Sequence, residues 1–237
     1  MLAGSALSTG DDKFTLHISP EASVELHAEW GEIQSMVYKM HEKCTLLQDL
    51  EAAEPVVTHA ESVLTGFLPI TPVSVGDSWK VDERTAVAIL AQFHNSATTT
   101  LHHGVGNDGA WATLVGISDS HAEILVRIHA EYKLGSVNEM DAWYTPAQFE
   151  GRLIIERQSG MVDAFALELP KTSPNVDVNI PVEHDGKWYH AADIGTVDVM
   201  RLSTEAPLGA LEFNTRIGID DARDILAERF YPCAAVD

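Results

Sequence analysis

Residues 149–169 read FEGRLIIERQSGMVDAFALEL, and this stretch decides the fold. Two runs rich in apolar residues, 149–157 and 161–169, flank the tripeptide Gln158-Ser159-Gly160. Each run is long enough to form a strand, and a three-residue link that contains glycine is typical of a β-hairpin. The stretch therefore predicts two neighbouring antiparallel strands.

The segments on both sides of this hairpin continue the strand pattern. In residues 122–132 the apolar positions alternate, so that Ile124, Val126, Ile128 and Ala130 would share one face of a long strand. The same reasoning places further strands at residues 98–102 and 111–117, at 191–203, near 209–214, and as a short pair within 13–30.

Helical periodicity is confined to a few segments. From Glu32 onward, apolar residues recur at helical spacing, which predicts an amphipathic helix over about 32–50 with Cys44 on its buried stripe. Other helices are expected at 56–67, at 82–93 with Asp82 as N-cap, and at 220–229. We therefore expect an α+β fold, a largely antiparallel β-sheet with flanking helices at the amino and carboxyl ends.

The segment Pro69-Ile70-Thr71-Pro72 interrupts these patterns and is the best candidate for a domain boundary. It would separate a helix-and-strand amino-terminal region, residues 1–70, from an α+β domain at 71–237. A chain of 237 residues can equally form one continuous domain.

The charge balance excludes two classes of partner. The chain has 36 acidic and 15 basic residues, a formal net charge of -21, and no local cluster of Lys and Arg. Such a field repels phosphate backbones and anionic lipid head groups, so we expect no nucleic acid or membrane-surface partner. No run approaches the roughly 18 apolar residues that a bilayer span needs, so we expect no membrane insertion. Residues 1–12 have no basic or apolar leader pattern, which predicts a cytoplasmic location for the sequence as it stands.

Catalytic motifs give no site. Residues 104–109, GVGNDG, satisfy the dinucleotide pattern, but the apolar run that follows them predicts a strand instead of the helix that such a site needs. The hydrolase pattern GxSxG, paired CxxC cysteines and an EF-hand loop are all absent from the sequence. We predict no catalytic residue and no cofactor.

Histidine and carboxylate residues leave a metal site open as an alternative. His129 and Glu131 are two apart on a predicted strand and would share a face, whereas the adjacent His102 and His103 would point to opposite sides. The pair could form a histidine-carboxylate site if joined by a further histidine from elsewhere in the chain: His94, His121, His184 or His190.

A series of short segments in constant order resembles the selenoprotein N family, in the region that precedes its redox site. The strongest is Arg127-Ile128-His129-Ala130-Glu131-Tyr132. The others span about residues 79–236: Phe93-His94, Ile117-Ser118-Asp119, Trp143, Pro146-Ala147-Gln148-Phe149, Gly151, Phe165, Pro170, Asn175-Val176-Asp177, Asp193-Ile194-Gly195, Ala222-Arg223 and Tyr231-Pro232.

The resemblance implies a role in redox chemistry, although the matched segment does not include the redox centre of the family. Selenoprotein N is an oxidoreductase of the endoplasmic reticulum membrane, whose Cys-selenocysteine pair follows the segment matched here. Because this sequence contains no such pair, the leading hypothesis is a non-catalytic scaffold that docks a thioredoxin-like or other redox partner. A thiol oxidoreductase that uses Cys44 and Cys233 is the alternative, and it needs the two sulfurs within bonding reach.

The matched residues also give a candidate binding patch. If His129 and Glu131 lie on one strand face, a polar and aromatic surface would form there from Arg127, His129, Glu131, Trp143 and Gln148. The competing interpretation is that the charges are solvated and the aromatic residues belong to the core.

Overall fold

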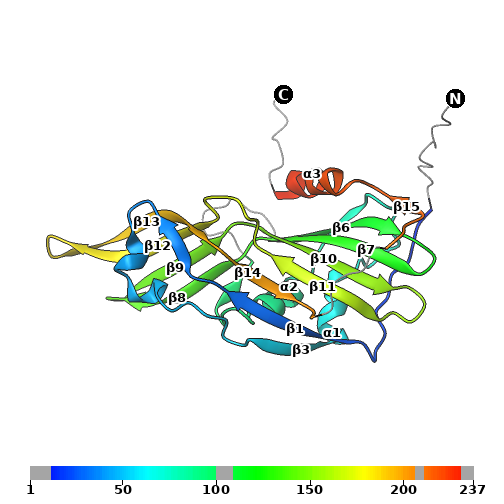
Figure 1. Ribbon diagram of the computed structural model, residues 1–237, viewed down its shortest axis with the longest axis horizontal. Coiled ribbons are helices and arrows are strands. Elements are labelled where there is room, and N and C mark those ends of the chain that lie inside the picture. The colour runs from blue at the N-terminus through cyan, green and yellow to red at the C-terminus, as the bar shows by residue number, and fades with distance from the viewer. Residues whose placement is uncertain (1–11, 100–108, 206–210, 231–237) are drawn as a thin grey trace, which may run out of the picture.

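The computed structural model describes residues 12–99, 109–205 and 211–230, and consists mainly of two antiparallel sheets (Figure 1). The first sheet has nine strands among the described residues, with β4 (Ser78–Lys80) paired to β6 beside the main order β15 (Thr215–Arg216), β6 (Ala110–Ile117), β7 (His121–Ile128), β10 (Phe149–Glu156), β11 (Val162–Glu168), β14 (Met200–Ser203), β1 (Ser23–Trp30) and β3 (Val56–Ala60).

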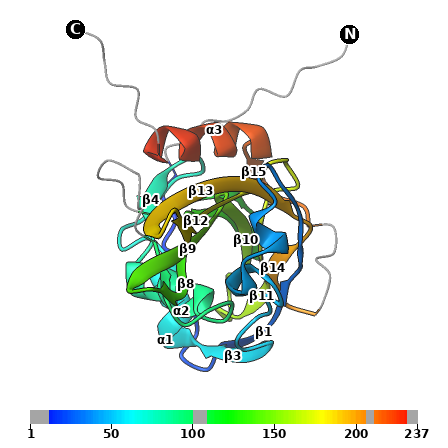
Figure 2. The same cartoon turned by 90° about the vertical axis from the view of Figure 1, so that its left-hand side faces the viewer.

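The second sheet has six strands among the described residues. Its order is β2 (Ile33–Met36), β13 (Lys187–Val197), β12 (Val176–His184), β9 (Met140–Pro146), β8 (Glu131–Val137) and β5 (Ala97–Thr98). Seen from the side of this sheet, the strands curve around the interior of the molecule (Figure 2). The largely antiparallel sheet expected from the sequence is confirmed.

The predicted hairpin is present as β10 and β11. Leu153 pairs with Phe165, and the turn between the strands contains Gly160 at a φ of 73°, a conformation that favours glycine. On its other edge β10 pairs with β7 along eight residue pairs, from Phe149↔Ile128 to Glu156↔His121. These three strands form the centre of the first sheet.

The strand expected over 122–132 is wrong, because the chain changes sheets within it. β7 ends at Ile128, the His129 N–H donates to the Gly109 carbonyl over 2.7 Å, and β8 begins at Glu131 in the second sheet. The alternation continues across this corner because both strands are buried, so periodicity alone does not reveal the change of direction.

The helix expected over 32–50 is also wrong. Residues 33–36 form β2, and two single 3₁₀ turns follow, η1 (Met40–Glu42) and η2 (Thr45–Leu47). Ile33 and Met36 are buried against the rest of the second sheet instead of on a helical stripe. The amino-terminal flanking helix is therefore absent.

The other expected elements have mixed outcomes. Residues 56–67 form β3 and then one helical turn, α1 (Glu61–Leu64), followed by η3 (Thr65–Phe67). The helix α2 (Glu83–Leu90) is confirmed, and its Asp82 cap accepts a hydrogen bond from the Thr85 N–H at 3.1 Å. The carboxyl-terminal helix is confirmed as α3 (Ile219–Phe230).

Strand expectations near the chain ends differ in detail. The strand expected at 191–203 is two strands in different sheets, β13 and β14. Phe14 makes only an isolated bridge to Val73, and β1 begins at Ser23. Part of the strand expected near 209–214 lies outside the described residues, and β15 follows it. The strands β8, β9 and β12 were not predicted.

Two apolar clusters hold these layers together. The main core lies between the sheets and includes the aromatic residues Trp30, Phe93, Tyr132, Tyr144 and Phe149. A second cluster packs α3 against the outer face of the first sheet, with Val115, Leu125, Ala222 and Leu226 buried. None of the described helices has the length and apolar character that a membrane crossing needs.

Candidate docking site

The β12–β13 hairpin forms one end of the molecule and projects beyond the neighbouring strands (Figure 1). A two-residue turn joins the strands, with Asp185 at a φ of 51° and Gly186 at 72°. An Asp-Gly pair with both φ angles positive is the favoured chemistry for a two-residue hairpin. The pairing runs from His184↔Lys187 to Val176↔Gly195.

Strand β2 lies along the other edge of β13, where Gly195 pairs with Met36. A Cβ at position 195 would overlap the Ser35 carbonyl oxygen, so this close approach of the two backbones requires glycine. The pairing brings the segment that follows β2 to the free part of the hairpin.

A buried carboxylate holds that segment in place. Asp193, 2% exposed, accepts hydrogen bonds from the Tyr38 N–H at 3.0 and 3.1 Å and from the Met40 N–H at 3.3 Å. The backbone between them turns through Lys39 at a φ of 56°. These bonds satisfy the two backbone N–H groups, which have no partner in a neighbouring strand of the described chain. They also fix the direction in which the chain leaves the sheet at Tyr38.

The hairpin and the held segment enclose a cavity of about 540 Å³, here called the β13 pocket. Figure 2 views the molecule from this end. Most of the lining is apolar, and a half-buried Cys44 and the charged Lys43 and Glu183 lie among Tyr38, Met40, Thr45, Leu46, Val137, Ile180, Pro181, Val182 and Trp188. A concave apolar surface with a few polar groups is typical of a binding site.

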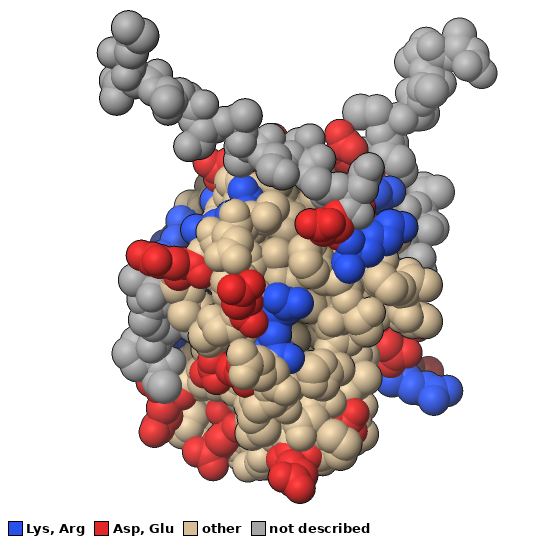
Figure 3. All heavy atoms as spheres, turned by 90° about the vertical axis from the view of Figure 1, so that its right-hand side faces the viewer, with Lys and Arg blue, Asp and Glu red and all other residues tan. Residues whose placement is uncertain are grey.

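Strand β13 and the segment after β2 carry several exposed apolar side chains, of which Tyr38 also lines the pocket. Of the seven large apolar side chains that are exposed among the described residues, four lie on β13 or directly after β2: Val37 (63%), Tyr38 (70%), Tyr189 (49%) and Ile194 (46%). The face at the opposite end carries interspersed acidic and basic side chains (Figure 3). A contiguous group of exposed apolar side chains is a candidate interaction surface, whereas single ones are normal on a protein surface.

The residues of the predicted patch are distributed over both sheets. Arg127 lies on β7 in the first sheet, with its guanidinium 5.9 Å from the ring of Phe230 in α3. Glu131 is buried at the start of β8, and Trp143 lies on β9 opposite Lys133. The expectation that His129 and Glu131 share the face of one strand is therefore wrong.

His129 and Gln148 lie at two of the corners where the chain passes between the sheets. His129 separates β7 from β8, and the buried Gln148 separates β9 from β10. Burial lowers the pKa of His129 to about 4, and its Nδ1 has no hydrogen-bond partner within the described part of the chain. A binding role for the predicted patch stays a prediction.

The histidines expected as metal ligands are placed apart. His94 bonds to Ser96 at 2.7 Å, and His190 lies 3.0 Å from the Asp141 carbonyl. His184, at the hairpin tip, pairs with the neighbouring Asp185. Over residues 12–99, 109–205 and 211–230, no three His, Cys, Asp or Glu side chains are grouped to hold a metal ion. His102 and His103 lie outside the described residues.

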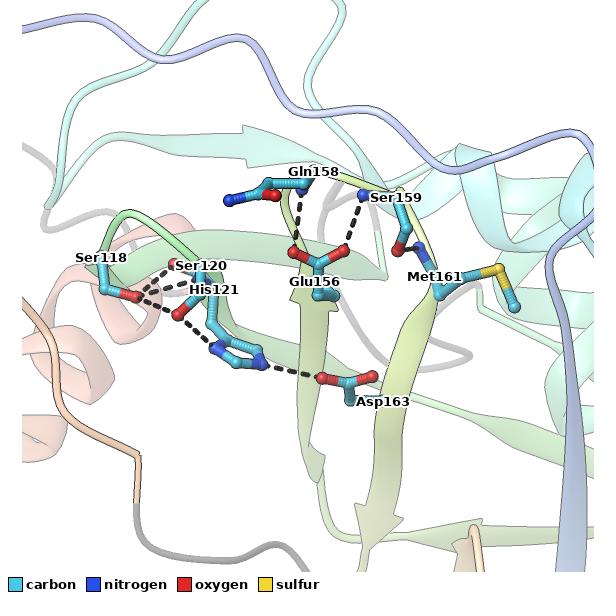
Figure 4. A network of polar contacts seen from close by, with 8 residues as sticks. All are labelled: Ser118, Ser120, His121, Glu156, Gln158, Ser159, Met161 and Asp163. Atoms are coloured by element: carbon cyan, nitrogen blue, oxygen red, sulfur yellow. Dashed lines mark hydrogen bonds and ion pairs between the residues drawn. The ribbon is translucent and has the colours of Figure 1, made fainter.

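His121 belongs to an array of Ser, His and Asp side chains at the start of β7 (Figure 4). Its Nδ1 lies 2.8 Å from Ser120 Oγ, and its Nε2 lies 2.8 Å from Asp163 Oδ2. Serine hydrolases link the same groups but place the serine in a pocket beside oxyanion donors. Here Ser120 and Asp163 are exposed, and the array ties the β6–β7 turn to β11.

One of the two cysteines in the thiol hypothesis, Cys44, lies in a different environment from the one expected. Cys44 was expected on a buried helical stripe, which is wrong: it precedes η2, its N–H donates to the Met40 carbonyl over 2.8 Å, and its side chain lines the β13 pocket. Cys233 lies outside the described residues. Their separation therefore stays untested.

The sequence carries one local signal for this pocket. Asp185-Gly186 between two runs of alternating residues is a strong hairpin pattern. The contribution of Tyr38, Cys44 and their neighbours was hidden, because their spacing also fits a helix.

Comparison with known proteins gives one group of relatives. The chain is 33% identical to human selenoprotein N and 32% identical to the zebrafish protein, in each case over 108 residues that make up 42% of this chain. It spans only 17% and 18% of the length of these two relatives. No family model and no solved structure matches it significantly. The chain thus contains a segment similar to part of selenoprotein N.

Proposed function

We propose that this chain is a non-catalytic docking domain of the selenoprotein N type, and that the β13 pocket and the apolar residues around it bind a protein partner. The observation that carries the proposal is the largely apolar lining of the cavity, which includes the exposed Tyr38, in a hairpin and segment that also carry the exposed Val37, Tyr189 and Ile194. Leaving these side chains in water costs free energy that a partner would recover by covering them.

The partner we propose is a thioredoxin-like protein or domain. The support is the similarity to part of selenoprotein N and the redox context that this resemblance implies, together with the apolar character of the surface. The chain has a net charge of -21, which would repel an acidic partner at long range. Binding through apolar contacts does not depend on long-range electrostatic attraction, so an apolar site suits this chain.

Binding of purified thioredoxin, measured by biolayer interferometry on the whole chain, tests the proposal. The variant Tyr38→Asp places a charge in the lining of the β13 pocket and should weaken binding at least about tenfold, the loss expected for an anchor residue. The matched control is Val56→Asp, an equally non-conservative change at an exposed apolar residue on β3. It should leave the Kd within about twofold of the original value.

Either of two results would contradict this proposal. One is the absence of saturable binding to the unmodified chain, and the other is an equal loss in both variants. Circular dichroism of each variant shows that the sheets are intact before binding is compared.

The half-buried position of Cys44 in the pocket favours a second candidate, thiol oxidation and reduction with Cys233. Titration of native thiols before and after mild oxidation tests it. Loss of both thiols together in a monomer supports the thiol pair, and independent reaction of the two, compared in Cys44→Ser and Cys233→Ser variants, excludes it.

A further inference from the structure

A second cavity, distant in sequence from the β13 pocket, gathers basic side chains in a strongly acidic chain. It has a volume of about 540 Å³ and is here called the β4 pocket, after the strand that forms one wall. We propose that it binds a small organic anion, a molecule with a phosphate or carboxylate group on an apolar body.

Three cations line this pocket, and each comes from a different part of the fold. Lys13 precedes the bridge between Phe14 and Val73, Lys80 ends β4, and Arg229 lies in the last turn of α3. In Figure 2, β4 runs beneath one end of α3. Charges brought together from three segments create a local positive potential that composition alone does not show.

Arg229 is held in position by two contacts. Its guanidinium lies 5.6 Å from the centre of the Trp111 ring, and its Nε donates to Ser78 Oγ over 2.9 Å. These contacts use Nε and one face of the guanidinium. The terminal N–H groups can therefore donate hydrogen bonds to an anion.

Two of these cations, Lys13 and Arg229, have no ion-pair partner among the described residues. The chain has 36 acidic residues for 15 basic ones, yet no described carboxylate forms an ion pair with either of them. The acidic residue in the lining is Asp77, and its Oδ2 already accepts the Ser74 N–H at 2.9 Å. An external anion would supply a counter-charge for Lys13 and Arg229.

The rest of the lining suits an apolar body. Trp79 is fixed by a hydrogen bond from its Nε1 to the Phe67 carbonyl at 2.9 Å, and Pro69, Pro72 and the fully exposed Ile70 form a rim. The cavity lies in the range of about 300–1,000 Å³ that small-molecule sites occupy, which is far more than a bare phosphate fills. The ligand class is therefore an organic anion instead of an inorganic ion.

Isothermal titration of the whole chain with three probes tests this inference: phenyl phosphate, benzoate and inorganic phosphate. Saturable binding of phenyl phosphate or benzoate, at least about tenfold tighter than that of inorganic phosphate, is expected. The better of the two organic probes identifies the preferred head group. Equal binding of all three overturns the organic-anion assignment, and no saturable binding of any probe overturns the site.

Charge variants locate the binding. Lys13→Gln and Lys80→Gln should each weaken the better probe about threefold, and the double variant about tenfold, as expected for partly exposed charges. The matched control is Lys171→Gln, an exposed lysine outside the pocket. A similar loss in the control would mean that only net charge matters and would overturn the proposal.

This site is independent of the proposed docking function. Tyr38→Asp should leave binding of the anion unchanged, and the lysine variants should leave thioredoxin binding unchanged, because the two pockets share no residue. Loss of anion binding in Tyr38→Asp would place the probe in the β13 pocket and would also overturn the assignment.

Discussion

Removing the Asp193 carboxylate should release the segment that carries Tyr38. In Asp193→Ala, the N–H groups of Tyr38 and Met40 lose an acceptor that is itself 2% exposed. Hydrogen bonds to a charged group contribute about 1.5–3 kcal/mol each. At the lower value for two donors, the free energy of unfolding should fall by about 3 kcal/mol.

Asp193→Asn separates the loss of charge from the loss of the acceptor. The amide oxygen can still accept one of the two bonds, so we expect a smaller decrease of about 1–2 kcal/mol. Asp224→Asn, at an exposed position on α3 with no described partner, is the control and should change stability by less than about 0.5 kcal/mol.

Urea unfolding followed by tryptophan fluorescence measures these differences, and heating provides a second measure. A loss of 3 kcal/mol corresponds to a decrease in Tm of about 6–12 °C for a chain of this size. Reaction of Cys44 with a thiol reagent in a Cys233→Ser background should also become faster, because the released segment leads into η1 and η2. An Asp193→Ala variant as stable as the control would refute the role assigned to this carboxylate.

Three further outcomes follow from buried contacts. Gly195→Ala would bring a Cβ against the Ser35 carbonyl, and should lower the free energy of unfolding by about 2 kcal/mol in urea titrations. Burial lowers the pKa of His129 from 6.5 to about 4, so the unfolded chain takes up the proton first as the pH falls. Stability should therefore decrease by about 1–2 kcal/mol from pH 7.5 to 5, and urea titrations of His129→Gln should lack this part of the decrease. Glu123, fully buried between two arginines, should cost about 3 kcal/mol when changed to Gln, and a thermal shift no larger than that of Asp224→Asn would contradict this.

The sequence predicted the elements whose signals are local. The β10–β11 hairpin, the Asp82 cap and α3 depend on residues close together in the chain, and all three are present. The wrong predictions concern segments whose secondary structure depends on pairing with residues far along the chain. Apolar residues at 33–47 fit a helix, but pairing with β13, far along the chain, makes residues 33–36 a strand.

The candidate site was harder to predict for the same reason. The β13 pocket combines residues 38–46 with residues 137 and 180–188, and no pattern along the chain reports that they meet. Similarly, the run from Arg127 to Tyr132 looks like one strand face until the corner at His129 separates its two ends. The resemblance to selenoprotein N singles out residues 127–132, but their contacts depend on the corner at His129.

The short corners between the sheets have a consequence for cooperativity. β1 leads into β2, β7 into β8, β9 into β10 and β13 into β14, each through only two residues. Local unfolding of a strand in one sheet should therefore disturb the hydrogen bonds of the strand that continues it in the other sheet. Amide hydrogens in the two sheets should exchange with similar protection, so that a partner bound at β13 slows exchange as far away as β7 and β10.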